Sequence, residues 1–250
     1  MVSPWTVQPN EIVRVFGIWV VFCVPTKTAT KRAILIQIQS FVFNPFQENT
    51  YVVYDDTKEA VVIDPGCYDE DEKSELADFI TENDLRIKML LNTHCHIDHV
   101  LGNQFVKEKF NTKLYIHPTE EFVLNAQKVI APHYGVHGYE DSAPDSFLNE
   151  GDRVTFGSQE FLVLFVPGHS PGHIAFYNER AKVLIAGDVL FQSSIGRTDL
   201  PGGNFDTLID SIHQKLFNLP DDVIVYPGHG GTTRIGIEKR TNPFCAVSKA

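Results

Sequence analysis

Three histidines, an aspartate and a cysteine lie within residues 94–99 of the segment NTHCHIDHVLGN. Imidazole nitrogens and carboxylate oxygens are ligands that zinc, iron and manganese accept. A core packed with unpartnered imidazoles would be costly, so these side chains are expected to bind something. His94, His96 and Asp98 alternate as in an extended chain and should point one way, with His99 reaching a second position. Cys95 should then point away, as a small buried hydrophobe.

Three more polar residues end apolar, strand-like segments: His169 in FVPGHSPGH, Asp188 in LIAGDVLF and His229 in VYPGHG. Together with the first cluster they make seven candidate ligands, which is too many for one tetrahedral ion. Two ions that share a carboxylate would use all seven. The pattern predicts a site for two divalent metal ions, with zinc expected first and iron or manganese as alternatives.

The remaining sequence predicts the elements that position these ligands. Alternating apolar residues indicate an antiparallel start over residues 34–43, 50–56 and 59–66. A helix over 70–83 and a strand over 87–93 lead into the histidine cluster, which places it at the carboxyl end of a strand. Further helices are expected at 100–110, 119–129 and 205–216. Further strands are expected at 153–156, 159–168, 173–178, 182–188 and 222–230, after a long loop at 130–151. Two sheets with helices attached predict an α/β sandwich.

Composition restricts the class of partner. A chain of 250 residues with 43% hydrophobic side chains can bury a sizeable core. Its formal charge of -11 repels phosphate backbones and anionic lipids, so neither nucleic acid nor a membrane is expected as a partner. Four scattered cysteines form no C-x-x-C pair, which favours a reducing cytoplasm as the location of the protein.

Residues 1–33 are expected to be an N-terminal extension and residues 34–250 the functional domain. The oligomeric state stays open.

THCHIDH resembles the H-x-H-x-D-H signature of the metallo-β-lactamase superfamily. VIDPG, VPGHSPGH, AGDVLF and YPGHG resemble its other motifs in their usual order, and the resemblance covers about residues 34–245. Within the superfamily, GRTDLPGG and EKRTNPF resemble the glyoxalase II-like hydrolases, especially the short bacterial kind. The resemblance implies an αββα sandwich, in which two mixed β-sheets are flanked by helices. That fold agrees with the order of the elements above.

The resemblance also implies a division of the ligands. One metal would be held by His94, His96 and His169, the other by Asp98, His99 and His229, with Asp188 as the bridge. Asp64 in VIDPG resembles the buried aspartate that supports the metal loop, and a plain turn carboxylate is the alternative reading.

The implied activity is metal-dependent hydrolysis of thioesters such as S-D-lactoylglutathione. Two dications lower the pKa of a bridging water, so that hydroxide is available to attack the carbonyl at neutral pH. Asp98 is expected to orient the hydroxide and to carry its proton, as the catalytic side chain. No side-chain nucleophile is needed.

Contacts to the substrate are weaker expectations. Arg197 would pair with a substrate carboxylate or lock Asp199, and the second role is favoured. His173 and Tyr177 follow His169 by four and eight residues, so one face of their strand is expected to look into the site. For His173, a hydrogen-bonded histidine near the rim is the favoured reading. His133, Tyr134 and His137 lie on the long loop and are further candidates to border the substrate.

Rival functions share the fold. THCHIDH and GRTD also resemble the persulfide dioxygenases, which hold a single iron by the equivalents of His94, His169 and Asp188. A flavodiiron oxidase is disfavoured because it has glutamate where this chain has His96, and GRTD and TNPF point away from a β-lactamase. A non-catalytic metal-binding protein is less expected, since a scaffold needs none of the seven ligands. Long glyoxalase II enzymes resemble the chain only as far as His229, before their glutathione-binding helical domain, so a thioester without glutathione stays open.

Overall fold

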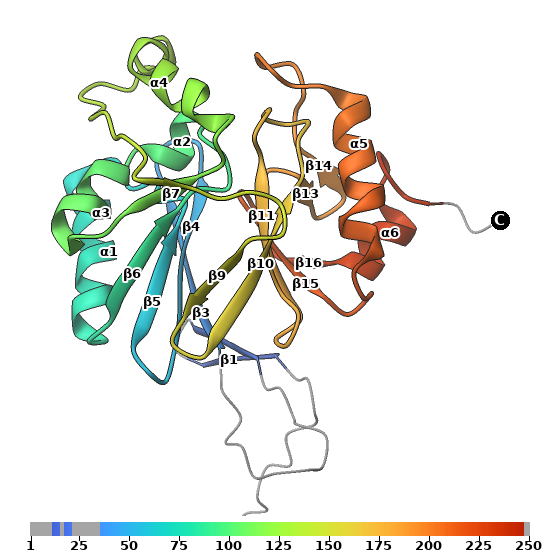
Figure 1. Cartoon of the computed structure of the whole chain (residues 1–250), viewed down its shortest axis with the longest axis horizontal. Helices are drawn as coiled ribbons and strands as arrows, with labels where there is room; N and C mark the ends of the chain where they lie inside the picture. The colour runs from blue at the N-terminus through green and yellow to red at the C-terminus, as the bar shows by residue number, and fades with distance from the viewer. Residues whose placement is uncertain (1–11, 16–17, 22–35, 248–250) are drawn as a thin grey trace, which may run out of the picture.

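The computed structural model describes residues 12–15, 18–21 and 36–247, which form two β-sheets packed face to face with helices on their outer sides (Figure 1). The first sheet has eight strands in sequence order: β1 (Ile12–Val15), β2 (Ile18–Val21), β3 (Ile36–Phe43), β4 (Glu48–Asp55), β5 (Glu59–Ile63), β6 (Arg86–Leu91), β7 (Leu114–Ile116) and β8 (Ser146–Phe147). Pairing is antiparallel from β1 to β5 and parallel from β5 to β8. The predicted antiparallel start is confirmed.

The second sheet has six strands in the order β16-β15-β12-β11-β10-β9. Their bounds are β9 (Arg153–Phe156), β10 (Gln159–Phe165), β11 (Ile174–Asn178), β12 (Val183–Gly187), β15 (Ile224–Pro227) and β16 (Thr233–Arg234). The β12–β15 pair is parallel and the others are antiparallel. A separate hairpin, β13 (Leu190–Phe191) with β14 (Ser194–Ile195), follows β12. Both large sheets are therefore mixed, as expected.

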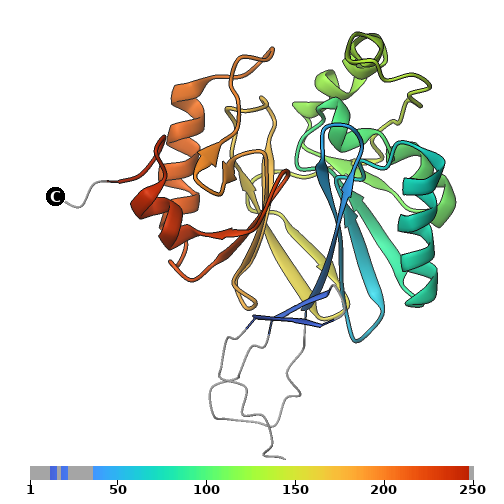
Figure 2. The same ribbon diagram turned by 180° about the vertical axis from the view of Figure 1, so that it is seen from behind.

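Helices cover the outer faces of both sheets, as the views from the front and from behind show (Figure 2). The first sheet is covered by α1 (Glu70–Glu82) and α3 (Asn103–Phe110), and the second by α5 (Phe205–Gln214) and α6 (Ile235–Thr241). Helices α2 (Ile97–Val100) and α4 (Glu120–Ile130) lie at one end of the sandwich. Two short 3-10 helices are η1 (Ala131–Tyr134) and η2 (Leu216–Asn218). Asp69 caps α1 by accepting from the Glu72 N–H, and Asn204 caps α5 by accepting from the Thr207 N–H.

Three layers of buried apolar side chains hold the sandwich together. Side chains between the sheets include Val53, Phe161 and Phe176. Two outer layers, represented by Leu76 of α1 and Leu208 of α5, join each sheet to its helices. Alternation along each strand divides its residues between an inner and an outer layer. This arrangement confirms the predicted αββα sandwich.

The predicted helix over 100–110 is wrong at its start. The structure has two helices, α2 and α3, separated at Gly102. The Gly102 N–H donates to the Pro65 carbonyl (2.7 Å), and the Asp98 carbonyl accepts from Asn44 Nδ2 (3.0 Å). In a continuous helix the Gly102 N–H would donate to the Asp98 carbonyl, but here each of these groups has a partner in another segment. A Cβ on Gly102 would also meet Cys67 Sγ at 2.4 Å.

The segment 130–151, predicted as a loop, contains η1 and the strand β8. The short elements β13, β14, β16 and α6 were not predicted, because two- to seven-residue elements carry almost no periodic signal. Two short described segments precede the main domain: β1 (12–15) pairs with β2 (18–21), and β2 pairs with β3. Most of residues 1–33 lies outside the described residues, so the domain boundary at residue 34 stays a prediction. Among the described residues, no helix has the length and apolar character needed to cross a bilayer.

Candidate metal centre

The seven candidate ligands meet at one end of the sandwich, where strands of both sheets terminate. The first cluster follows β6 and runs into α2. His169 follows β10, Asp188 follows β12 and His229 follows β15. The second sheet therefore delivers three donors from three separate strand ends, as predicted from the apolar segments before them.

His94, His96 and His169 form the first group of converging donors. His96 Nδ1 lies 2.9 Å from His169 Nε2, which lies 3.2 Å from His94 Nε2. Nitrogens bound tetrahedrally to one zinc ion lie about 3.3 Å apart. The three nitrogens are thus spaced much as ligands of a single ion would be.

Asp98, His99 and His229 form the second group. Asp98 Oδ2 lies 3.2 Å from His229 Nε2 and 3.7 Å from His99 Nε2. Asp98 and His99 belong to α2, so the expected extended alternation ends at His96. The helical turn from Ile97 brings both side chains to the same centre, and Cys95 points into the core, as expected.

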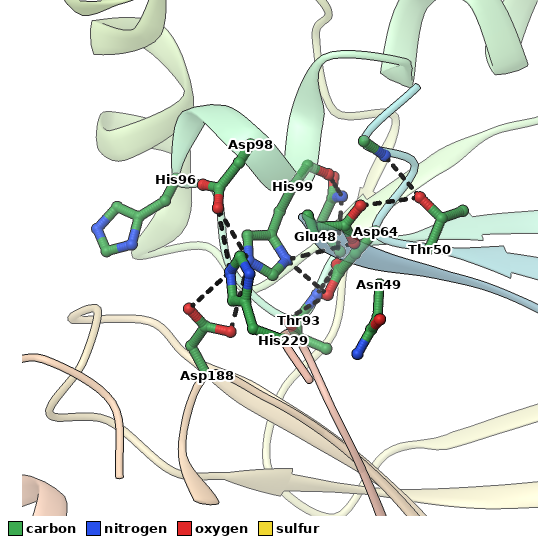
Figure 3. A network of polar contacts seen from close by, with 12 residues as sticks. Glu48, Asn49, Thr50, Asp64, Thr93, His96, Asp98, His99, Asp188 and His229 are labelled. Atoms are coloured by element: carbon green, nitrogen blue, oxygen red, sulfur yellow. Dashed lines mark hydrogen bonds and ion pairs between the residues drawn. The ribbon is translucent and has the colours of Figure 1, made fainter. Parts of the chain in front are cut away.

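Asp188 faces residues of both groups, and Figure 3 shows it beside His229 of the second group. Its Oδ2 is 3.5 Å from His169 Nε2 and 3.5 Å from His229 Nε2, and its Oδ1 is 3.5 Å from His99 Nε2. Gly228 makes room for this carboxylate, since a Cβ there would stand 2.1 Å from Asp188 Oδ1. One carboxylate thus faces both groups, as a bridging ligand must.

In four of the histidines, one ring nitrogen is hydrogen-bonded to a protein group and the other points toward the centre. The anchored atoms are His94 Nδ1 on Thr93 Oγ1 (3.1 Å), His99 Nδ1 on Asp64 Oδ2 (3.2 Å), His169 Nδ1 on the Arg197 carbonyl (2.7 Å) and His229 Nδ1 on the Phe46 and Gln47 carbonyls (3.2 Å each). Such anchors fix the tautomer and the ring orientation of metal-ligating histidines.

Asp64 is buried beneath the first cluster, as the resemblance implied. Its Oδ1 accepts from the Thr93 N–H (2.7 Å), and its Oδ2 accepts from Thr93 Oγ1 (2.6 Å). Its backbone has φ of 49°, a left-handed conformation that is uncommon for residues other than glycine but that aspartate adopts more readily than most. The carboxylate binds both the loop that carries His94 and the ring of His99.

The protonation states of the first group and of Asp98 and Asp188 fit metal ligands. Burial lowers the pKa of His94, His169 and His173, and it lowers the pKa of His96 to about 3, so these rings are neutral at pH 7. Burial raises the pKa of Asp98 and of Asp188, but nearby histidines outweigh it and keep both ionised. Metal ligands need these forms.

Two buried atoms of the centre have no hydrogen-bond partner: His99 Nε2 and Asp188 Oδ1. Unpaired buried polar atoms are costly, and a cation between them would satisfy both. The donor chemistry, the protonation states and these orphaned atoms all fit bound divalent ions.

Glu120 supports the first group and was not recognised from the sequence. Its buried Oε2 accepts from the Cys95 N–H (2.8 Å), and its Oε1 accepts from Ser170 Oγ (2.5 Å) and the Gly172 N–H (2.7 Å). It therefore joins the loop of His94 and His96 to the loop of His169. In the sequence it looks like an ordinary acidic residue at a helix start, which gives no sign of this role.

Glu48 is a second unrecognised buried carboxyl group. Its Oε1 has no hydrogen-bond partner and lies 3.8 Å from His99 Nδ1, while its Oε2 accepts from Thr50 Oγ1. Burial raises its pKa well above the usual value. Figure 3 shows His99 between Glu48 and Asp64 on one side and Asp98 and Asp188 on the other.

A cavity of about 460 Å³ opens onto the donors. His96, Asp98, His169, Asp188 and His229 line its floor. Most of the remaining lining is apolar and includes Phe46, Ile97, Phe122, Ile130, Tyr134, Phe191 and Leu200. Of the three loop residues suggested as bordering the substrate, Tyr134 alone lines this cavity.

Of the three residues suggested as weak substrate contacts, His173 and Tyr177 do not line the cavity, and His173 is hydrogen-bonded, as its favoured reading required. His173 is fully buried and does not line the cavity; its Nε2 accepts from the Asp188 N–H (3.1 Å), and its ring stacks on His94. Tyr177 is buried in the layer between the second sheet and its helices. Arg197 does line the cavity, and both its Nε and Nη2 donate to Asp199 at 2.7 Å, as the favoured role required.

Known proteins resemble the chain over most of its length. The family model that matches residues 43–229 is described as the metallo-beta-lactamase superfamily. The chain belongs to this superfamily. "Hydroxyacylglutathione hydrolase GloC" of Haemophilus influenzae is 40% identical over 211 residues, which cover 84% of this chain and 98% of that protein. "Probable metallo-hydrolase YqgX" of Bacillus subtilis is 39% identical and covers 80% of this chain and 93% of its own length.

Solved structures agree with this membership. "BLEG-1 B3 metallo-beta-lactamase" has a TM-score of 0.75 and 36% identity, covering 84% of this chain and 100% of its own. "TTHA1623 in a di-iron-bound form" has a TM-score of 0.74 and 38% identity, covering 82% and 98%. "ETHE1 from Myxococcus xanthus" has a TM-score of 0.68 and 28% identity, covering 84% of each chain. Together the matches support a metal-dependent hydrolase that binds divalent ions.

Proposed function

We propose that the chain is a dinuclear metallo-hydrolase that cleaves thioesters. The observation that carries the proposal is the position of Asp188, whose two oxygens face both groups of donors. The first group would hold one ion and the second group the other, with Asp188 between them. The 40% identity to a protein named hydroxyacylglutathione hydrolase supports the thioester as substrate. Zinc is the expected metal, with iron and manganese as alternatives.

The chain's own residues account for the rest of the reaction. Two bound divalent ions supply Lewis acidity, which makes hydroxide available near neutral pH and polarises a carbonyl oxygen. The ionised Asp98 lines the cavity, where it accepts a hydrogen bond from the attacking water and takes up its proton. The buried anchors hold the imidazoles in place, so little reorganisation is needed as charge develops.

Metal content and two activity assays test this proposal. Purified protein is expected to hold about two zinc-class ions per chain and to release thiol from S-D-lactoylglutathione or from an uncharged acyl thioester. Asp188→Asn keeps the side-chain volume and should abolish the activity, whereas Asp222→Asn, which changes a surface ion-pair partner of Lys182, should not. Protein with two ions that cleaves no thioester would refute the proposal.

The second candidate is a mononuclear iron persulfide dioxygenase. The di-iron-bound form of TTHA1623 supports iron as a metal for this type of site, and the similarity to ETHE1 keeps the candidate open. It would use His94, His169 and Asp188 and leave the second group without an ion. One iron per chain, with oxygen consumption that depends on glutathione persulfide, would favour it over the hydrolase.

A further inference from the structure

The wall of the cavity beside the donors is apolar and belongs largely to α4. Phe122, Ala126 and Ile130 recur every fourth residue, so they form one stripe along the helix, and all three line the cavity. Phe46 and Tyr134 extend this surface, with their rings edge-to-face at 6.0 Å. The same cavity contains His96, Asp98 and Asp188, so a molecule whose reacting carbonyl meets the donors would touch this wall.

Phe122 is 79% exposed although it lines the cavity. An exposed aromatic ring beside a polar centre is the kind of surface that a ligand covers. Val129 is also strongly exposed on α4, at 70%, but it does not line the cavity. It offers a matched control for the effect of removing an exposed apolar side chain from the same helix.

The cavity offers little to a charged arm. Among the described residues that line it, Arg197 is the one lysine or arginine, and Asp199 occupies its Nε and Nη2. The glutathione arm of a thioester carries two carboxylates and an ammonium group, and charged groups without partners are costly to desolvate.

We propose that the α4 wall binds an uncharged, apolar arm of the substrate, so that the enzyme prefers apolar thioesters to glutathione thioesters. The proposal rests on thioester hydrolysis as the function of the site. In the reaction, water adds its oxygen to the acyl carbon, the C–S bond breaks, and a carboxylic acid and a thiol leave with no oxidation or reduction. The apolar arm is the acyl chain or the thiol part, and the substrates below distinguish the two.

The test measures thiol release by the metal-loaded protein from four types of thioester. S-acetyl and S-hexanoyl N-acetylcysteamine vary the acyl arm, S-benzyl thioacetate varies the thiol arm, and S-D-lactoylglutathione is the charged comparison. We expect kcat/KM to be at least about 10-fold higher for a thioester with one apolar arm than for S-D-lactoylglutathione, since a few methylene groups in an apolar pocket give about this discrimination. Preference for the hexanoyl or for the benzyl compound identifies the arm.

Phe122→Ala is expected to lower kcat/KM for the preferred apolar thioester about 10-fold, mainly through KM, and to affect the S-acetyl compound much less. Val129→Ala should leave both values within about twofold. Calorimetric binding of the non-hydrolysable thioether S-hexyl N-acetylcysteamine gives a readout that does not require turnover, and Phe122→Ala should weaken it similarly.

The outcomes separate this inference from the proposed function. Hydrolysis of S-D-lactoylglutathione as fast as any apolar thioester, with no effect of Phe122→Ala, would overturn the inference and leave the hydrolase intact. Loss of S-D-lactoylglutathione hydrolysis in Arg197→Gln, beside an unaffected Phe122→Ala, would also overturn it, in favour of a charged arm. Failure to cleave any of the four thioesters would instead contradict the proposed function.

Discussion

The two groups of donors differ in charge although they share Asp188. His94, His96 and His169 are three imidazoles that burial keeps neutral. In the second group burial also disfavours charge, but Asp98 and Asp188 outweigh it and raise the pKa of His99 and His229. The first group is therefore ready to accept a cation, whereas the second must exchange protons for it. The two candidate functions also differ at the second group, which holds a metal ion in the dinuclear hydrolase and none in the mononuclear dioxygenase.

Asp188→Asn should remove the link between the two groups and have the largest effect. Replacing an anionic oxygen that faces both groups is expected to lower metal content and to reduce thioester hydrolysis by more than about 100-fold, since loss of a mere hydrogen-bond partner of a ligand costs about 10- to 100-fold. Elemental analysis and thiol release measure both. Full metal content with unchanged kcat would show that Asp188 is no ligand.

Asp64→Asn should act chiefly on the second group. Its Oδ2 accepts from His99 Nδ1, so an amide there leaves the ring without its anchor. Metal affinity of the second ion should fall about 10- to 100-fold while the first ion binds more nearly as before. Competition with a chromophoric chelator resolves the two affinities. Equal weakening of both ions would mean that Asp64 acts on the loop as a whole.

Glu120→Gln should act on the first group, because Glu120 joins the loops of His94, His96 and His169. Both oxygens of Glu120 accept hydrogen bonds, so the NH₂ group of glutamine would face a donor and lose at least one of them. We expect the affinity for the first ion to fall about 10-fold. Glu121→Gln, its exposed neighbour on α4, is the matched control. The same chelator competition applies, and selective weakening of the second ion would contradict the assignment of Glu120 to the first.

Proton release should be the smallest but most direct difference. At pH 7 the first ion should release almost no protons, because its imidazoles are already neutral. The second should release about one, because Asp98 and Asp188 hold the pKa of His99 well above its usual value despite its burial, and the metal displaces the proton of that ring. Binding at the second position should accordingly weaken as pH falls. Calorimetry in buffers of different ionisation enthalpy counts the protons, and equal release by both ions would remove the distinction between the groups.

The donors could be predicted from the sequence because each ends an apolar segment. The side chains that brace them could not. Glu120 contacts Cys95 and Ser170, which lie 25 and 50 residues away in sequence, and no local spacing records such contacts. The weaker suggestion that His173 contacts substrate was wrong for a related reason: strand alternation gives the face of its strand, but its burial and its bond to the Asp188 N–H depend on tertiary packing.

The same limit applies to backbone geometry. The predicted helix begins at residue 100, whereas the structure breaks at Gly102, where Pro65 and Asn44 take up the hydrogen bond that would continue the helix. Asp98 and His99 lie on α2, just before this break. The identities of these ligands were visible in the sequence, but their local conformation was set by tertiary contacts.

Helix α4 has two sides with different roles: one packs into the protein beside the donors, and the other lines the cavity. Glu120 and Leu124 are buried on the inward side, and Gln127, which also borders the cavity, donates from Nε2 to the Cys95 carbonyl beside the donors. Phe122, Ala126 and Ile130 face the cavity. Substitutions on the cavity side can therefore alter which molecule is accepted without loosening the inward contacts. If the proposed function holds, single substitutions along this stripe are expected to change the preferred substrate at little cost in folding stability.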